Sequence, residues 1–95
     1  MTHERFLQVC AQPEPPAALT PELLSLYWDA RGDWGQAHTV AQEIETPLGS
    51  ALHAYLHRKE GDAGNARYWY TRAGRPVHRG TLDDEWNDLA RECCK

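Results

Sequence analysis

The sequence predicts an all-α fold, a five-helix antiparallel stack in a single domain over residues 1–95. The first observation is a repeated corner: Gly32-Asp33 and Gly61-Asp62 lie 29 residues apart, a spacing that indicates an internal repeat. The second is a repeated helix start, a threonine followed by proline, at 20–21 and again at 46–47. These signals predict two helical hairpins with flanking helices at both ends.

The N-terminal segment precedes the hairpins. Residues 3–11 could form a short helix with Thr2 as its cap and Phe6 and Val9 among its apolar contacts, although its length makes it weak on its own. Residues 12–16, QPEPP, cannot continue a helix because proline removes N–H donors and fixes φ. They therefore predict a stiff connector.

The hairpins span residues 19–47 and 48–76. In the first, we expect helices from Thr20 to about residue 31 and from the cap Asp33 to residue 45. In the second, we expect helices over 48–60 and 62–74, because Gly61 suits the left-handed residue that ends a helix and Asp62 can accept from the free amides of the next.

A C-terminal capping helix is expected over residues 81–95. Thr81 is its cap, and its apolar residues share one stripe at helical spacing: Leu82, Trp86, Leu89, Ala90 and Cys93. Two hairpins leave open ends, so we expect this helix to cover one end and segment 3–11 the other. A homodimer that buries an end would serve as well.

The hairpins resemble the tetratricopeptide repeat over roughly residues 19–76. The matching small-residue and turn positions are Ala54, Gly61-Asp62, Ala66 and Ala73 in the second hairpin, and Ser25, Gly32-Asp33, Trp34 and Ala37 in the first. Ile44 and Glu45 depart from the family pattern, and the repeat is shorter than the usual ~34 residues. The segments HAYLHRKEGD and YWYTRAGRP also resemble segments of small uncharacterised bacterial proteins. The resemblance implies a protein-binding groove lined by the first helices, at Glu22, Leu26, Asp29, Ala51, Tyr55 and Arg58.

Composition excludes several classes of protein. The formal net charge of -4 argues against sequence-independent phosphate binding, so we predict no nucleic-acid partner. Sustained apolar segments are absent, so we predict neither membrane insertion nor a signal peptide. Three cysteines, two of them vicinal, indicate free thiols in a reducing compartment. These observations predict a cytoplasmic protein.

His53, His57 and Glu60 fall in one row of the third predicted helix of the hairpins, at i, i+4 and i+7. Histidines at that spacing can chelate zinc, nickel or copper. The HExxH arrangement is absent, and ordinary surface or core histidines are the simpler interpretation, so we predict no metal and no cofactor. A helical wheel places this row toward solvent. The alignment with the tetratricopeptide repeat, which we call the repeat register, instead encloses the row beside Trp69 or Tyr70. We favour the register.

The aromatic and basic residues of the next helix form a second candidate cluster. Trp69 and Tyr70 lie on its core face, whereas Tyr68 and Arg72 lie toward the other face. An arginine beside exposed aromatic rings can bind carboxylates, phosphates or partner side chains. Alternatively, Arg72 and Arg75 only interact with the negative end of their helix.

Charge is divided along the chain, with cations concentrated over residues 58–79 and acids from residue 83 onward. An acidic final helix lying along a basic hairpin would explain both. Alternatively, the basic face stays open and receives an acidic peptide or a C-terminal carboxylate.

We therefore predict a protein-binding or scaffolding module for an unknown protein or peptide partner. We do not expect an enzyme, since the sequence has no Gly-rich phosphate loop, nucleophile elbow or metalloprotease motif. The alternative is a small-ligand, anion or metal-binding protein that uses His53, His57, Tyr70 and Arg72. The candidate binding residues are His53, His57, Tyr55, Arg58, Tyr68, Tyr70, Arg72 and Arg75.

Overall fold

The all-α prediction is confirmed by a computed structural model that describes residues 1–94, in which six helices and no strand are present. The short helix that residues 3–11 could form is present, capped by Thr2 and anchored by buried Phe6 and Val9, and it brings the count to six, one more than the predicted five-helix stack. The helices are α1 (His3–Val9), α2 (Pro21–Ala30), α3 (Trp34–Gln42), α4 (Pro47–Glu60), α5 (Ala63–Ala73) and α6 (Leu82–Cys93). Within residues 1–94, no helix has both the length and the apolar character needed to cross a membrane.

The corners between α2 and α3 and between α4 and α5 have the same local geometry. Gly32 and Gly61 both have left-handed backbone angles, with φ of +83° and +90°, which glycine adopts without steric cost. The amides of Asp33 and Asp62 each donate a 2.9 Å hydrogen bond to the carbonyl five residues earlier. Each aspartate then caps the following helix by accepting an amide three residues on. The chain therefore reverses direction in the same way at both corners.

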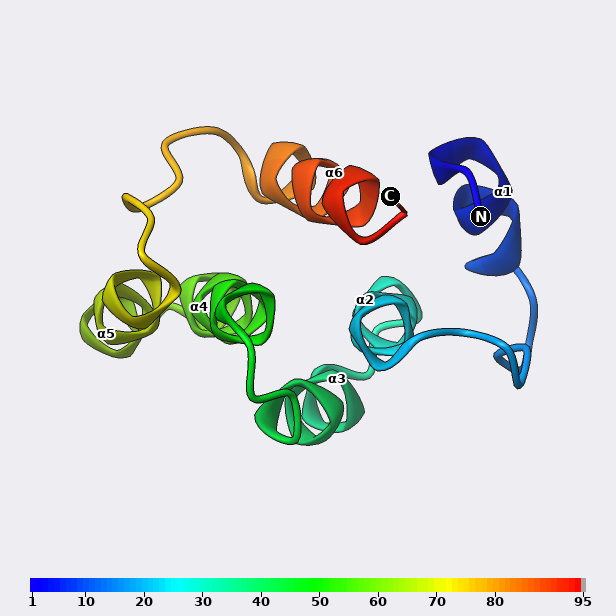
Figure 1. Cartoon of the computed structure of the whole chain (residues 1–95), viewed down its shortest axis with the longest axis horizontal. Coiled ribbons are helices and arrows are strands. Elements are labelled where there is room, and N and C mark those ends of the chain that lie inside the picture. The colour runs from blue at the N-terminus through cyan, green and yellow to red at the C-terminus, as the bar shows by residue number, and fades with distance from the viewer. Residues whose placement is uncertain (95) are drawn as a thin grey trace.

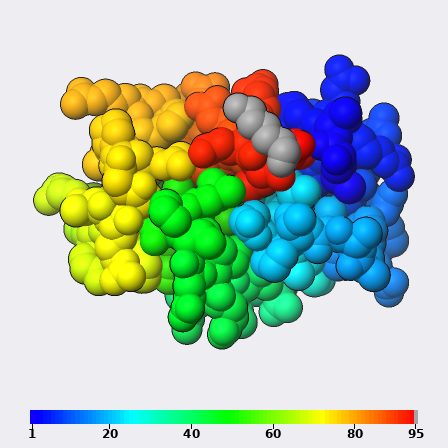
Figure 2. Space-filling view, in the orientation of Figure 1, coloured from blue at the N-terminus to red at the C-terminus, as the bar shows by residue number. Residues whose placement is uncertain are grey.

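Helices α2 and α4 lie in the middle of the molecule, with α6 and α1 on one side and α3 on the other (Figure 1). Helix α6 packs against both α2 and α4, and α1 packs against α6. This differs from the expectation that the flanking helices cover opposite ends of the stack. In Figure 2 the red end of the C-terminal segment borders both the dark blue N-terminal segment and the green segment, whereas its orange start lies above the yellow segment.

The apolar stripe of α6 explains its position. The Trp86 indole N–H donates to the Leu26 carbonyl of α2 at 3.2 Å, and its ring stacks on Phe6 of α1 with centroids 5.7 Å apart. Leu89 and Ala90 are buried beside it. The face formed by α2 and α4 buries more of this apolar stripe than an end of the stack would bury. Helix α6 therefore lies across that face.

Candidate functional site

The candidate residues on the α6 side of the hairpins are all engaged by carboxylates. The Tyr55 hydroxyl donates to buried Asp29 at 2.6 Å. Arg58 donates to Glu85 at 2.8 Å and also to the Gly80 carbonyl. The Tyr70 hydroxyl donates to the other carboxylate oxygen of Glu85 at 2.6 Å.

Further along α6, Arg75 donates through both terminal nitrogens to Glu92, each at 3.0 Å. The acidic helix therefore lies along the basic hairpin, as one of the two charge interpretations predicted. Burial raises the pKa of Tyr55 and of Tyr70, and the hydrogen bonds to Asp29 and Glu85 raise both further, so these phenols stay protonated. Of the positions predicted to line an open groove, Asp29, Tyr55 and Arg58 are thus held by neighbouring side chains, and α6 packs against both helices that carry them.

On the opposite side of α4, three imidazoles meet. His53 and His57 are 5% and 7% exposed, so the repeat register predicted their enclosure correctly and the helical wheel was wrong. The third is His38 of α3, whose Nε2 lies 2.8 Å from Nε2 of His53 in a hydrogen bond, so one of these two nitrogens donates its N–H to the other. One nitrogen from each ring lies within 4.8 Å of the other two. We call these residues the histidine trio.

Indole rings flank the histidine trio on both sides. The Trp34 ring stacks on His38 with centroids 4.9 Å apart, and Trp69 stacks on His53 at 3.9 Å. The Trp34 indole N–H donates to the Leu56 carbonyl at 2.8 Å, which fixes α3 against α4. The trio is therefore held between two rigid aromatic surfaces.

Hydrogen bonding orients His57, and burial disfavours the charged forms of the other two rings. Nδ1 of His57 donates to Glu60 at 2.6 Å, which fixes the orientation of the ring. Burial, together with the imidazoles of His38 and His57, lowers the pKa of His53 to about 4. Burial and the neighbouring His57 also lower the pKa of His38. A metal ligand is a neutral imidazole that presents a lone pair, so metal binding would require the donor of the His38–His53 hydrogen bond to carry its proton on Nδ1 instead.

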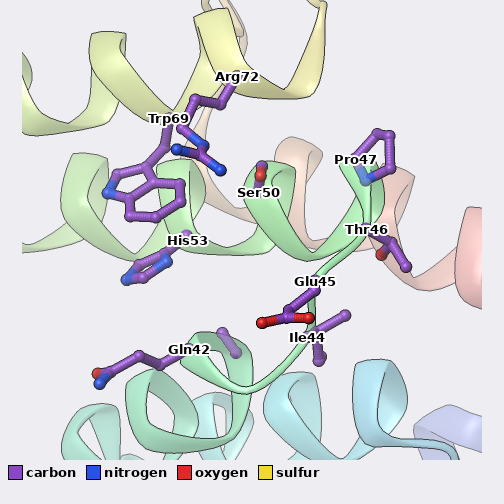
Figure 3. Close-up of a pocket in the computed structure, with 10 residues that line it drawn as sticks. Gln42, Ile44, Glu45, Thr46, Pro47, Ser50, His53, Trp69 and Arg72 are labelled. Carbon is purple, nitrogen blue, oxygen red and sulfur yellow. The ribbon is translucent and has the colours of Figure 1, made fainter.

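A pocket of about 410 Å³ opens beside His53. Figure 3 shows its walls, with α5 residues above, α4 residues behind, and the segment joining α3 to α4 below. We call it the Trp69 pocket; it is lined by Ala41, Gln42, Ile44, Glu45, Thr46, Pro47, Ser50, His53, Trp69 and Arg72. Of the trio, only His53 lines it.

Tyr68 and Arg72 lie on the exposed face of α5, as predicted. The Arg72 guanidinium lies over the rings of Trp69 and Tyr68, at 5.3 and 5.9 Å, and donates to the Tyr68 hydroxyl at 3.2 Å. The predicted group of His53, His57, Tyr70 and Arg72 is thus divided. Trp69 brings Arg72 beside His53, whereas the Tyr70 hydroxyl is directed to Glu85 of α6.

The sequence analysis missed His38, the third member of the trio, and its neighbour Trp34. A signal was present, because Trp34 and His38 are four apart and share one face of α3. In an antiparallel stack that face can meet α4, which carries His53 and His57. Without the packing of α3 on α4, however, nothing distinguished His38 from an exposed histidine.

Comparisons with protein-family models, curated proteins and solved structures find no match to this chain. The site must therefore be interpreted from its own geometry.

Proposed function

We propose that this protein binds a divalent transition-metal ion, zinc or a chemically similar metal, through His38, His53 and His57. The observation that carries the proposal is the convergence of three imidazole nitrogens, within 4.8 Å of one another, from two different helices. Bonds of about 2.0–2.1 Å to zinc place tetrahedral donors about 3.3 Å apart. The 2.8 Å between the His38 and His53 nitrogens and the 4.8 Å limit for the trio bracket that spacing.

The surroundings of the trio support the proposal. A metal-bound histidine usually donates its other ring N–H to a carboxylate or carbonyl, which fixes the ring and raises its basicity. His57 makes such a bond to Glu60 at 2.6 Å. Three protein ligands also leave a coordination position open, as in sites where the metal binds a water or a second ligand. This proposal differs from the prediction of no metal that was made from the sequence. The row of residues recognised in the sequence contained only two imidazoles, His53 and His57, and His38 supplies the third.

The predicted protein-binding or scaffolding function is less well supported by this geometry. Even if the hairpins are tetratricopeptide-like, as the resemblance implies, the groove of that fold would be lined by α2 and α4. Here α6 packs on both helices, and Arg58 and Asp29 already have charged partners, Glu85 and Lys59. A peptide would have to displace a helix that carries part of the core. We therefore favour metal binding, the alternative raised from the sequence.

Metal titration tests the proposal directly. Tag-free protein, freed of metal by a chelator, is titrated with Zn(II) by calorimetry and with Co(II) by visible absorption. We expect one ion per chain, and a Co(II) spectrum typical of tetrahedral coordination. His38→Ala and His57→Ala should weaken binding by more than the roughly 10–100-fold that loss of an outer partner costs, and Glu60→Gln should fall within that range.

His78→Ala is the matched control, because His78 lies outside the trio and pairs with Asp88 at 3.0 Å. It should bind the metal as the wild type does. Circular dichroism verifies that each variant is folded. Absence of stoichiometric binding to the wild type, or equal binding by His38→Ala and His78→Ala, would show that the trio is only a packing feature.

A further inference from the structure

The Trp69 pocket has opposite charges on two of its walls. Arg72 approaches from α5, and Glu45 approaches from the segment that joins α3 to α4 (Figure 3). Within residues 1–94, neither side chain forms an ion pair. Both are solvent-exposed, so the pocket presents a cation and an anion with their charges unpaired.

The Arg72 side chain and the backbone next to Glu45 are held in place by their surroundings. Arg72 is fixed over Trp69 and by its 3.2 Å bond to the Tyr68 hydroxyl, which uses one of the five guanidinium N–H groups. The backbone next to Glu45 is packed tightly on α4, since a Cβ at Gly49 would collide with the Ile44 carbonyl oxygen. The Arg72 wall is therefore set before any ligand arrives, which reduces the entropy lost on binding. The Glu45 side chain is exposed on a fixed segment of backbone.

The rest of the lining suits a small organic molecule. The volume of about 410 Å³ falls within the ~300–1,000 Å³ typical of small-molecule sites. Trp69, Ile44 and Pro47 offer apolar surface, while Gln42 and Ser50 offer hydrogen-bonding groups. Glu45 disfavours a ligand that carries only negative charge, and Arg72 disfavours one that carries only positive charge.

We propose that the Trp69 pocket binds a small amino-carboxylate zwitterion, with its carboxylate on Arg72 and its ammonium group on Glu45. Guanidinium groups bind carboxylates through paired N–H donors, and both contacts are charge-assisted. The carbon chain of the ligand then lies along Trp69. This site is separate from the proposed metal site, since only His53 belongs to both, and the two proposals can fail independently.

Matched ligands test the charge requirement. Metal-free protein is used, because amines and carboxylates also coordinate metals. The probes are 6-aminohexanoate, hexanoate and hexylamine, which share a six-carbon chain and differ in charge, together with leucine, whose two charges are close together. Saturation-transfer NMR detects binding, and calorimetry measures affinity. We expect one of the two zwitterions to bind at one per chain, at least about ten-fold more tightly than hexanoate or hexylamine.

Matched variants assign each charge to a wall. Arg72→Gln should reduce the affinity for the zwitterion to the level of hexylamine, and Glu45→Gln should reduce it to the level of hexanoate. The controls are Arg67→Gln, on the same helix, and Glu43→Gln, beside the same segment; both are exposed and neither lines the pocket. Both should bind as the wild type does.

The results that overturn the proposal are distinct. The first is a lack of binding by both zwitterions. The second is equal affinity for the zwitterions and for the singly charged probes. The third is an equal loss of affinity in the pocket variants and in the control variants. Failure of the metal titration leaves this proposal standing, and failure here leaves the metal site standing.

Discussion

Two arginine–glutamate pairs in this protein allow the effect of burial on an ion pair to be measured. Glu85 of α6 is 3% exposed and accepts from Arg58 and from the Tyr70 hydroxyl. Glu92, on the same helix, pairs with Arg75 at 3.0 Å, but the side chains are 41% and 33% exposed. We compare Glu85→Gln with Glu92→Gln, a substitution that removes the charge and preserves the shape in both.

The expected difference is large relative to the stability of the protein. Removing one partner of a buried pair typically costs about 3–5 kcal/mol, because the other charge stays buried without compensation. Gln retains one acceptor oxygen, and Arg58 is 24% exposed and keeps the Gly80 carbonyl as a partner, so we place Glu85→Gln below this range, at about 2–3 kcal/mol. An exposed pair contributes roughly 0–1 kcal/mol, which sets the expectation for Glu92→Gln. A chain of this length has a free energy of unfolding of roughly 5–14 kcal/mol.

Urea unfolding at pH 7, followed by circular dichroism, measures both variants against the wild type. The double variant Arg58→Met/Glu85→Met should recover much of the loss, because it leaves no unpaired buried charge. The reasoning is refuted if Glu85→Gln lies within about 1 kcal/mol of Glu92→Gln, or if the double variant is less stable than either single variant.

Three further predictions concern the histidines, a close backbone contact and the metal. The pKa of His53 is lowered from its ordinary value of 6.5 to about 4 in the folded protein. Between pH 6.5 and pH 4, the unfolded chain therefore binds a proton at His53 that the folded protein does not bind. The free energy of unfolding of metal-free wild type should therefore fall by about 2 kcal/mol relative to His53→Gln between pH 7 and pH 5, measured by urea unfolding; parallel pH profiles would contradict it. Gly49→Ala forces a Cβ against the Ile44 carbonyl and should cost about 1–3 kcal/mol, whereas Gly35→Ala, whose nearest contact is 3.8 Å away, should be neutral or stabilising by up to ~1 kcal/mol. Thermal or urea unfolding of the two alanine variants would contradict this if their stabilities are equal. Zn(II) at about 100 times its dissociation constant should add about 2.7 kcal/mol to the free energy of unfolding, and an unchanged melting temperature would contradict metal binding by the folded state.

Local chemistry made the helices predictable from the sequence. Thr20, Thr46 and Thr81 cap α2, α4 and α6, and their hydroxyls accept the amide three residues later. Gly61 has the left-handed conformation that its position between two helices predicted. Each of these signals acts within a few residues, so it operates in the same way whatever the rest of the chain does. The ends were less well predicted. Helix α3 ends at Gln42 rather than at residue 45, α1 ends at Val9 rather than at residue 11, and α6, predicted over 81–95, ends at Cys93, with residue 95 outside the described residues.

The sites depended on contacts that no local pattern contains. His38 meets His53 across 15 residues of sequence, and Arg58 meets Glu85 across 27. The apolar stripe around Trp86 was visible in the sequence, yet whether it covered an end or a face of the hairpins depended on which surface buried more of it. The amino-acid sequence by itself determined where most of the helices begin and end, because hydrogen bonds within one turn decide this. It did not determine which faces are buried, since the helical wheel of α4 placed the enclosed His53 and His57 toward solvent. Only the tertiary structure decided which charges are paired, which imidazoles converge and which charges face the pocket, because these follow from how packed helices align with one another.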